Sequence, residues 1–259
     1  MMKALILMIQ FMTRYPIPVT IEFTAERFVE GMKWMPLVGL LAALPATAGF
    51  ILADHLLGRE VGAIVAVIAL IVITGGLHLD GIADTADGLF SYRSRERMLE
   101  IMRDSTLGTN GVIALVLTVL LKYIFLHNIP ASGAALAVLA TPVLGRMALT
   151  WHSAVARYAR EQPGIGDYVN QTGLAQAAAA TLLSLFLVTG MLLLWGVQPN
   201  MVPLVVVLLH VPAILLAVLF AFSLKKRLGG ITGDTIGATV EIAEVATFLV
   251  FLIIWKFLL

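Results

Sequence analysis

The sequence predicts an all-α integral membrane protein, a polytopic helical bundle of about seven transmembrane helices plus an N-terminal interfacial helix. Of its 259 residues, 60% are hydrophobic and only 13% are charged, whereas a soluble domain carries about 25% charged residues. Long apolar stretches recur along the whole chain, and a crossing needs about 20 mostly apolar residues. The chain has no cysteine, which excludes disulfides, thiolate nucleophiles and thiolate metal sites.

The expected helices follow in order from the apolar stretches. Residues 1–12 are apolar with one lysine and are too short to cross a bilayer, so we expect an interfacial helix there. Seven longer stretches are candidate crossings, and a re-entrant path is open for the third and fourth. They comprise residues 35–53, 61–79, 112–127, 134–151, 178–195, 202–224 and 239–259. No internal repeat or soluble domain is evident, so residues 1–259 are expected to form one membrane-embedded domain.

The distribution of basic residues predicts the orientation. If the N-terminus is cytoplasmic, every Lys and Arg except Arg59, Lys122 and Lys256 falls on the cytoplasmic side. An excess of Lys and Arg marks cytoplasmic loops. Of the acidic residues, Asp54 and Glu60 are expected on the opposite side. The side chains capable of chemistry are therefore expected to face the cytoplasm.

Three aspartates at the end of the second apolar stretch predict a metal site. Asp80, Asp84 and Asp87 are spaced i, i+4 and i+7, so on an α-helix they lie within an arc of roughly 60°. Like charges at this spacing repel, and charge beside a membrane is costly. A bound cation relieves both effects, and clustered carboxylates suit Mg²⁺ or Mn²⁺. The alternative is a polar helix end that reaches water or packs against a neighbour.

The segment after these aspartates resembles the start of a helix that could bind phosphate. Asp104 or Ser105 is a candidate N-cap, and a helix start offers N–H groups to a phosphate. Asp104 is also a candidate fourth metal ligand. An ordinary cap followed by a flexible turn, with Gly108 and Gly111, remains the alternative.

Several further residues are candidates for binding a substrate phosphate or completing the site. Arg14 and Arg146 are candidate phosphate clamps, whereas the arginines at 93, 95 and 97 fit a solvated or lipid-facing role better. Asp234, flanked by threonines in a glycine-rich run, is a candidate site residue on weak evidence. Glu241 and Glu244 are either helix-dipole partners or site carboxylates. His78 is expected to orient a neighbour through a hydrogen bond rather than to act as a base.

A carboxylate-held metal with several arginines and no cysteine fits phosphoryl-group transfer. The ion neutralises phosphate oxygens, and a carboxylate takes the proton of the attacking hydroxyl. A secondary transporter is the rival class, but transporter sites lie near the midplane, often between repeats. Here the carboxylates crowd one membrane surface.

Four motifs resemble the cobalamin synthase family, also called the adenosylcobinamide-GDP ribazoletransferases, along essentially the whole chain. They are residues 11–18 (FMTRYPIP), 75–88 (GGLHLDGIADTADG), 97–105 (RMLEIMRDS) with Gly108 and Gly111, and 229–238 (GGITGDTIGA). A looser similarity links the chain to the CDP-alcohol phosphotransferases. That family's Ala-Arg pair is absent here, because Ala83 is followed by Asp84.

The resemblance implies a Mg²⁺-dependent transferase, with Mn²⁺ as a substitute, in the inner (cytoplasmic) membrane of a prokaryote. Its substrates would be adenosylcobinamide-GDP and α-ribazole 5′-phosphate, or α-ribazole. Its products would be GMP and adenosylcobalamin 5′-phosphate, or adenosylcobalamin. The bilayer, other cobalamin-assembly enzymes and a second copy of the chain are expected partners, and nucleic acid is not. A CDP-alcohol phosphotransferase-like enzyme on another substrate, a transporter and an assembly scaffold remain alternatives.

The resemblance also suggests roles for the candidate residues. Asp80, Asp84 and Asp87 would hold the metal, and Asp104 would either complete that shell or act as the base, with Asp84 as the other candidate catalytic carboxylate. The groups expected to bind substrate are Arg14, His78, Arg103, Ser105, Gly108, Gly111, Arg146, Thr232, Asp234, Thr235 and Glu241.

Overall fold

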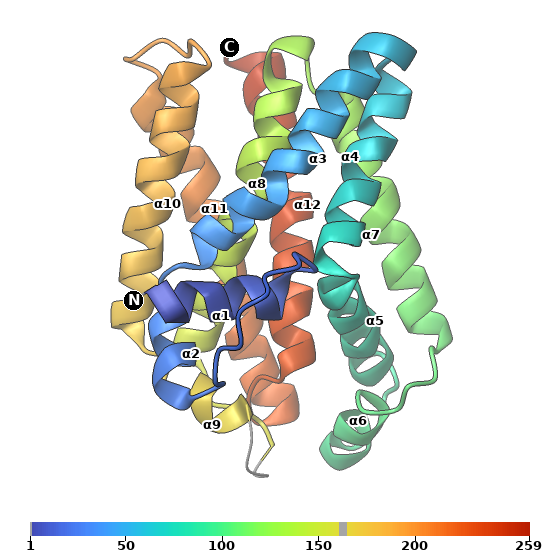
Figure 1. Ribbon diagram of the computed structural model, residues 1–259. Helices are drawn as coiled ribbons and strands as arrows, with labels where there is room; N and C mark the ends of the chain where they lie inside the picture. The colour runs from blue at the N-terminus through green and yellow to red at the C-terminus, as the bar shows by residue number, and fades with distance from the viewer. Residues whose placement is uncertain (1, 161–164) are drawn as a thin grey trace.

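The computed structural model describes residues 2–160 and 165–259, and within them the protein is all helical apart from one isolated bridge between Tyr158 and Ile231 (Figure 1). The elements in chain order are α1 (Met2–Met12), α2 (Ala25–Met32), α3 (Met35–Leu57), α4 (Arg59–Thr74), α5 (Leu77–Leu89), α6 (Arg95–Ile101), α7 (Thr109–Asn128), α8 (Ala131–Val155), α9 (Ile165–Val169), α10 (Leu174–Leu194), α11 (Val202–Leu228) and α12 (Gly233–Phe257).

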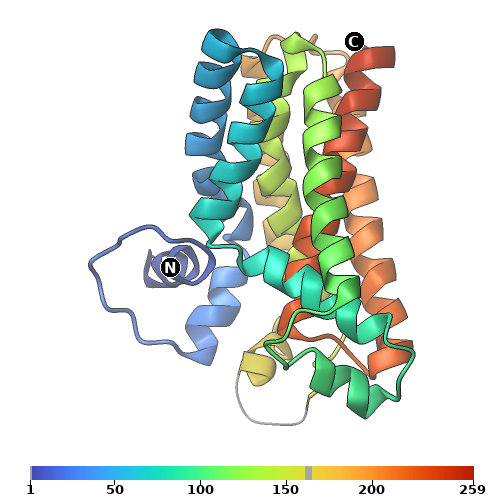
Figure 2. The ribbon, with the colours of Figure 1, turned by 90° about the vertical axis from the view of Figure 1, so that its right-hand side faces the viewer.

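Six of the described helices are long and apolar enough to cross a membrane: α3, α7, α8, α10, α11 and α12. They follow the long axis of the bundle in Figures 1 and 2. The prediction of a polytopic helical bundle is confirmed: six of the seven expected crossings are continuous helices, and the bent pair α4 and α5 would make the seventh if it counts as one broken span. The third and fourth candidates are the continuous helices α7 and α8, of 20 and 25 residues, so the re-entrant path is wrong for them.

The second expected crossing, residues 61–79, is wrong as a single helix. α4 ends at Thr74, and α5 starts at Leu77 after a bend of 89°. Gly75 and Gly76 have φ angles of 64° and 73°, a left-handed conformation that ends helices and that residues with a side chain rarely adopt. As a result α5, which carries the three aspartates, turns away from the direction of α4 (Figure 2).

The centre of the bundle is α8, which packs against α3, α10, α11 and α12. Nearly all of its residues are buried, and many are Ala, Gly or Thr. Small residues let neighbouring helices approach closely, which is how helices associate in a membrane. The tightest approach is to α3, where a Cβ added to Gly39 would lie 2.2 Å from the Pro142 carbonyl oxygen.

The N-terminal residues form the expected helix. α1 lies across the bundle rather than along it, and Figure 2 shows it almost end-on beside the upright helices. One face is buried, including Leu7, Met8 and Met12, and it packs mainly on α2 and α3. This orientation fits an interfacial helix.

Four charged side chains lie deeper than the charge distribution predicted. Arg146 was assigned to the cytoplasmic surface and Lys122 to the opposite surface, but both lie within helices and are only 1% and 5% exposed. α12 starts at Gly233, six residues before the expected 239. Glu241 and Glu244 are therefore inside the helix and buried, rather than at its start. The two basic residues pair with these glutamates, which explains how the charges are accommodated.

Candidate functional site

The candidate site forms where α5 crosses the start of α12. A Cβ added to Gly81 would lie 2.6 Å from the Asp234 carbonyl oxygen and 3.2 Å from the Gly237 Cα. Two backbones approach this closely where a glycine leaves room for them. The contact places the aspartates of α5 beside the N-terminal end of α12, some 150 residues later in the chain.

Asp80 and Asp84 line a cleft of about 750 Å³ at this end of the bundle. The cleft combines carboxylates, which suit a divalent cation, with guanidinium groups, which suit phosphate. Its charged and hydroxyl-bearing lining residues are Arg14, Asp80, Asp84, Arg103, Asp104 and Ser105. The helix break at Gly75 and Gly76 also lines it, so residues from three of the four motifs meet in one cleft.

Negative charge accumulates around Asp84. This side chain is half-buried, and Asp80, Asp234 and Asp87 all act on it electrostatically, while Arg160 offsets them in part. Mutual repulsion of this kind favours binding of a cation. Within the described residues, no three His, Asp or Glu side chains are already arranged to hold a metal. Mg²⁺ commonly uses one or two carboxylates together with water and substrate phosphates, so the donors at Asp80 and Asp84 fit such an ion chemically.

Asp87 makes contacts that the sequence did not predict. Its buried carboxylate accepts hydrogen bonds from the backbone N–H groups of Gly108 and Gly111, each at 2.8 Å. Gly108 is the N-cap of α7 and has no side chain to satisfy these donors, so Asp87 caps α7 from α5. The helix start that was expected to receive phosphate thus directs two N–H groups at Asp87. Its role as a metal ligand stays a prediction.

The loop between α6 and α7 places Asp104 at the surface. Neither Asp104 nor Ser105 is the N-cap of α7, because the helix starts later, at Thr109. Asp104 instead accepts a hydrogen bond of 2.9 Å from the Thr106 N–H. Hydrogen bonds from the Thr106 backbone and hydroxyl lower the pKa of Asp104, which makes this carboxylate a weaker proton acceptor.

The glycine-rich run at 229–237 is the turn between α11 and α12. Gly229 ends α11 with a φ of 77°. The hydroxyl of Thr232 accepts from the Thr235 N–H, and the Thr235 hydroxyl accepts from the Thr232 N–H, which is a capping box. Both threonines are completely buried, so their main contacts stabilise the helix start rather than line the cleft.

Asp234 is held by a residue that sequence reasoning did not select. Its Oδ2 lies 3.1 Å from an amino group of Arg160 and accepts a 3.1 Å hydrogen bond from the Thr232 hydroxyl. Arg160 lies 74 positions earlier in the chain, and no local pattern indicates the pairing. The pair fixes the carboxylate of Asp234 beside Asp80 and Asp84.

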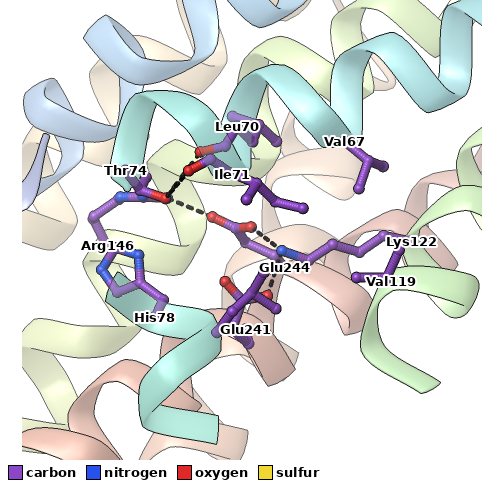
Figure 3. Close-up of a pocket in the computed structure, with 11 residues that line it drawn as sticks. Val67, Leu70, Ile71, Thr74, His78, Val119, Lys122, Arg146, Glu241 and Glu244 are labelled. Atoms are coloured by element: carbon purple, nitrogen blue, oxygen red, sulfur yellow. Dashed lines mark hydrogen bonds and ion pairs between the residues drawn. The ribbon is translucent and has the colours of Figure 1, made fainter. Parts of the chain in front are cut away.

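A buried group of four charges lies within the bundle and is shown in Figure 3. The ammonium of Lys122 lies 2.7 Å from Glu241 and 2.6 Å from Glu244, and Arg146 pairs with Glu244. We call these four residues the buried charge cluster. It joins α7, α8 and α12, and its two positive and two negative charges balance, as buried charges require. Sequence reasoning selected Arg146 and Glu241 but assigned Lys122 elsewhere, because the pairing joins residues about 120 positions apart.

His78 lies beside the buried charge cluster. It is 2% exposed, and its Nε2 has no hydrogen-bond partner among the described residues. Next to it is a cavity of about 10 Å³, lined also by Lys122, Arg146 and Glu241. That is about the space for one water molecule, which could supply the hydrogen bond expected of His78.

Comparisons with known proteins agree on one family. The model of the family described as cobalamin-5-phosphate synthase matches residues 4–252. A curated relative named adenosylcobinamide-GDP ribazoletransferase from Caldanaerobacter subterraneus subsp. tengcongensis is 38% identical, covering 98% of this chain and 99% of the relative. Relatives of the same name from Acetivibrio thermocellus and Klebsiella pneumoniae are 37% and 36% identical, covering 96% and 97% of this chain and 97% and 100% of their own lengths. No solved structure matches the chain.

The capping role of Asp87 predicts that Asp87→Asn destabilises the fold. The amide retains one acceptor oxygen but turns an N–H donor towards the start of α7, so we expect a loss of about 1–2 kcal/mol. Thermal melting of the purified protein in detergent measures the loss. Asp80→Asn is the matched control, because Asp80 is exposed on the same helix and should melt like the wild type. Equal melting temperatures for Asp87→Asn and the wild type would contradict the capping role.

Proposed function

The chain belongs to the cobalamin-5-phosphate synthase family, and on that basis we propose that it joins α-ribazole 5′-phosphate, or α-ribazole, to adenosylcobinamide-GDP. The family resemblance inferred from the motifs is confirmed, as is the expectation of a transferase in cobalamin synthesis. A ribose hydroxyl would attack the phosphorus next to the cobinamide. The bond between that phosphorus and the bridging oxygen would break, releasing GMP and leaving adenosylcobalamin 5′-phosphate or adenosylcobalamin.

The observation that supports this reaction best is the mixed charge of the 750 Å³ cleft. Arg14 and Arg103 provide donors for the oxygens of a diphosphate. Asp80 and Asp84 provide acceptors for a cation that accompanies those oxygens. A transporter or an assembly scaffold would not require arginines and carboxylates together in one cleft at the end of the bundle.

We propose that Asp80 and Asp84 hold Mg²⁺, or Mn²⁺ in its place, with Asp87 and Asp104 as the less favourably placed candidates. The ion would neutralise charge on the transferring phosphate. Two contacts hold Arg14 in place for binding phosphate. Its backbone N–H donates to the Ile73 carbonyl at 2.7 Å, and its guanidinium lies against Gly75. The arginine is thereby held at the helix break beside the aspartates.

Of the two candidate bases, Asp84 is the better placed. It is half-buried among like charges, an environment that favours uptake of a proton, and the base would be the carboxylate oxygen that does not contact the ion. Asp104 is fully exposed, and the Thr106 hydrogen bonds that lower its pKa work against proton uptake. Asp104 is therefore assigned to the outer part of the cleft, where it could contact a substrate or its hydrated ion.

We further propose that the cleft opens to the cytoplasm from the inner membrane of a prokaryote. Basic residues that remain exposed gather at the same end of the bundle as the cleft, just before and on α6 and at the end of α11, among them Arg93, Arg97, Lys225 and Lys226. That excess is typical of the cytoplasmic side. Association with other cobalamin-assembly enzymes or with a second copy of the chain stays a prediction.

Replacing Asp80 by Asn should lower turnover by roughly hundredfold or more, because the group that faces the cation and phosphate loses its charge. The assay is GMP release from adenosylcobinamide-GDP and α-ribazole 5′-phosphate in a membrane fraction. Glu60→Gln is the control, since Glu60 is an exposed carboxylate at the far end of α4, and it should retain full activity. Normal turnover by Asp80→Asn would contradict the proposed site.

Removal of divalent ions should stop the reaction. We expect EDTA to abolish GMP release and Mg²⁺ to restore it, with Mn²⁺ as a substitute. Asp84→Asn removes one carboxylate donor. The Mg²⁺ concentration that gives half of this variant's own maximal activity should therefore be at least tenfold higher than for the wild type. Turnover that resists the chelator would rule out the metal.

The orientation can be tested with single cysteines, because the chain has none of its own. Lys226→Cys, near the end of α11, should react with a membrane-impermeant maleimide only after the cells are opened. Asn200→Cys, in the connection between α10 and α11 at the other end of the bundle, should react in intact spheroplasts. The reverse pattern would place the cleft outside the cell.

A further inference from the structure

A second pocket adjoins the charged cleft but has a different character. It has a volume of about 300 Å³ and lies between α1, α2, α5, α8 and α12. Leu77 and Asp80 line both the pocket and the cleft, so the two spaces meet at the aspartate proposed to hold the ion. A transferase for two substrates needs two such adjoining spaces.

The walls of this pocket are mainly apolar and partly aromatic. Phe11 and Phe28 contribute rings whose centroids lie 6.3 Å apart in an edge-to-face arrangement. Met32, Leu149 and Ile236 supply aliphatic surface. Flat ring systems bind well against such walls, because stacking and burial of apolar surface both contribute.

Three polar side chains around the pocket already have partners within the protein, whereas Asp80 at its edge and His78, whose Nε2 has no hydrogen-bond partner among the described residues, also line it. The Ser153 hydroxyl donates to the Leu149 carbonyl at 3.0 Å, and the Tyr158 hydroxyl accepts from the Gly233 N–H at 3.3 Å. Asp234 is engaged by Arg160 and Thr232. Away from the edge at Asp80, the pocket therefore offers one unpartnered side-chain group, the Nε2 of His78, to a ligand whose recognition depends on several hydrogen bonds.

We propose that this pocket binds the benzimidazole base of the ribazole substrate, which rests on the proposed function. The bicyclic base lies between Phe11 and the aliphatic wall, and its ribose emerges at Asp80, where the attacking hydroxyl meets the phosphate held in the charged cleft. Adenosylcobinamide-GDP then occupies the larger, open cleft. Phe11 becomes a determinant of specificity for the acceptor nucleotide.

The chemistry of the two substrates favours this assignment over its reverse. Guanine carries a carbonyl, an amino group and a ring N–H, and burying them without partners is unfavourable. The hydrocarbon edge of benzimidazole has no such groups. The corrin ring is far too large for 300 Å³, whereas a bicyclic base fits the lower end of the usual range of ligand pockets.

Phe11→Leu tests the assignment because it removes a ring but keeps an apolar side chain. We expect KM for α-ribazole 5′-phosphate to rise about fivefold or more, in line with the contribution of base stacking on an aromatic ring. KM for adenosylcobinamide-GDP should not change, and kcat should change little. The matched control is Phe23→Leu, because Phe23 touches Phe11 at a centroid distance of 5.7 Å but does not line the pocket. Phe23→Leu should leave both KM values unchanged.

A second variant fills the pocket instead of opening it. Ser153→Leu should raise KM for α-ribazole 5′-phosphate more than tenfold, and Ser153→Ala should not, since the hydroxyl serves only its own helix. If Ser153→Leu melts at a much lower temperature than the wild type, its KM is not used. The comparison of Phe11→Leu with Phe23→Leu then tests the assignment by itself.

Three results would overturn the assignment. A rise in KM for adenosylcobinamide-GDP alone would place guanine in the pocket. Equal rises for both substrates would indicate a structural role for the ring. No change in either KM would mean that the pocket holds lipid or takes no part in the reaction. Failure of the proposed function itself would look different, because the wild type would then release no GMP from this substrate pair.

Discussion

The contact between Gly81 of α5 and the backbone of α12 at Asp234 and Gly237 is the constraint on which the candidate site depends. Without a Cβ at this crossing, the two helices meet backbone to backbone, which brings the aspartates of α5 towards Asp234 of α12. Gly81, Asp234 and Gly237 at the crossing line the apolar pocket, and Asp80 lines both this pocket and the charged cleft. A larger residue at 81 would push the helices apart and disturb both spaces at Asp80, the carboxylate that they share.

Much of this arrangement could be predicted from local sequence. The apolar stretches gave six crossings, the spacing of Asp80 and Asp84 gave a common helix face, and the four motifs gave the family. The break between α4 and α5 could not be found from hydropathy, because residues 61–79 are apolar throughout except near their end. The signal was present in Gly75 and Gly76, but a pair of glycines predicts close packing as readily as a left-handed turn.

The errors at Lys122 and Arg146, and the capping contact of Asp87 that was not predicted, have a shared physical origin. Each of these side chains is satisfied by a partner far away in sequence: two glutamates of α12 for the basic residues, and the start of α7 for the aspartate. A reading of the sequence assigns an unpaired charge to water, because burial of a lone charge is prohibitive. Only the fold reveals that the partner has been buried too.

The shortness of α4 affects the lipid around the site. Its 16 residues span about 24 Å, less than the roughly 30 Å of a typical hydrocarbon layer. Such hydrophobic mismatch is relieved when the adjacent leaflet thins. Headgroups beside α4 would then lie closer to the bilayer midplane than elsewhere, so the membrane–water interface would slope inwards towards the bend at Gly75. An amphiphilic corrinoid travelling along the leaflet would thus reach the charged mouth without having to leave the membrane surface.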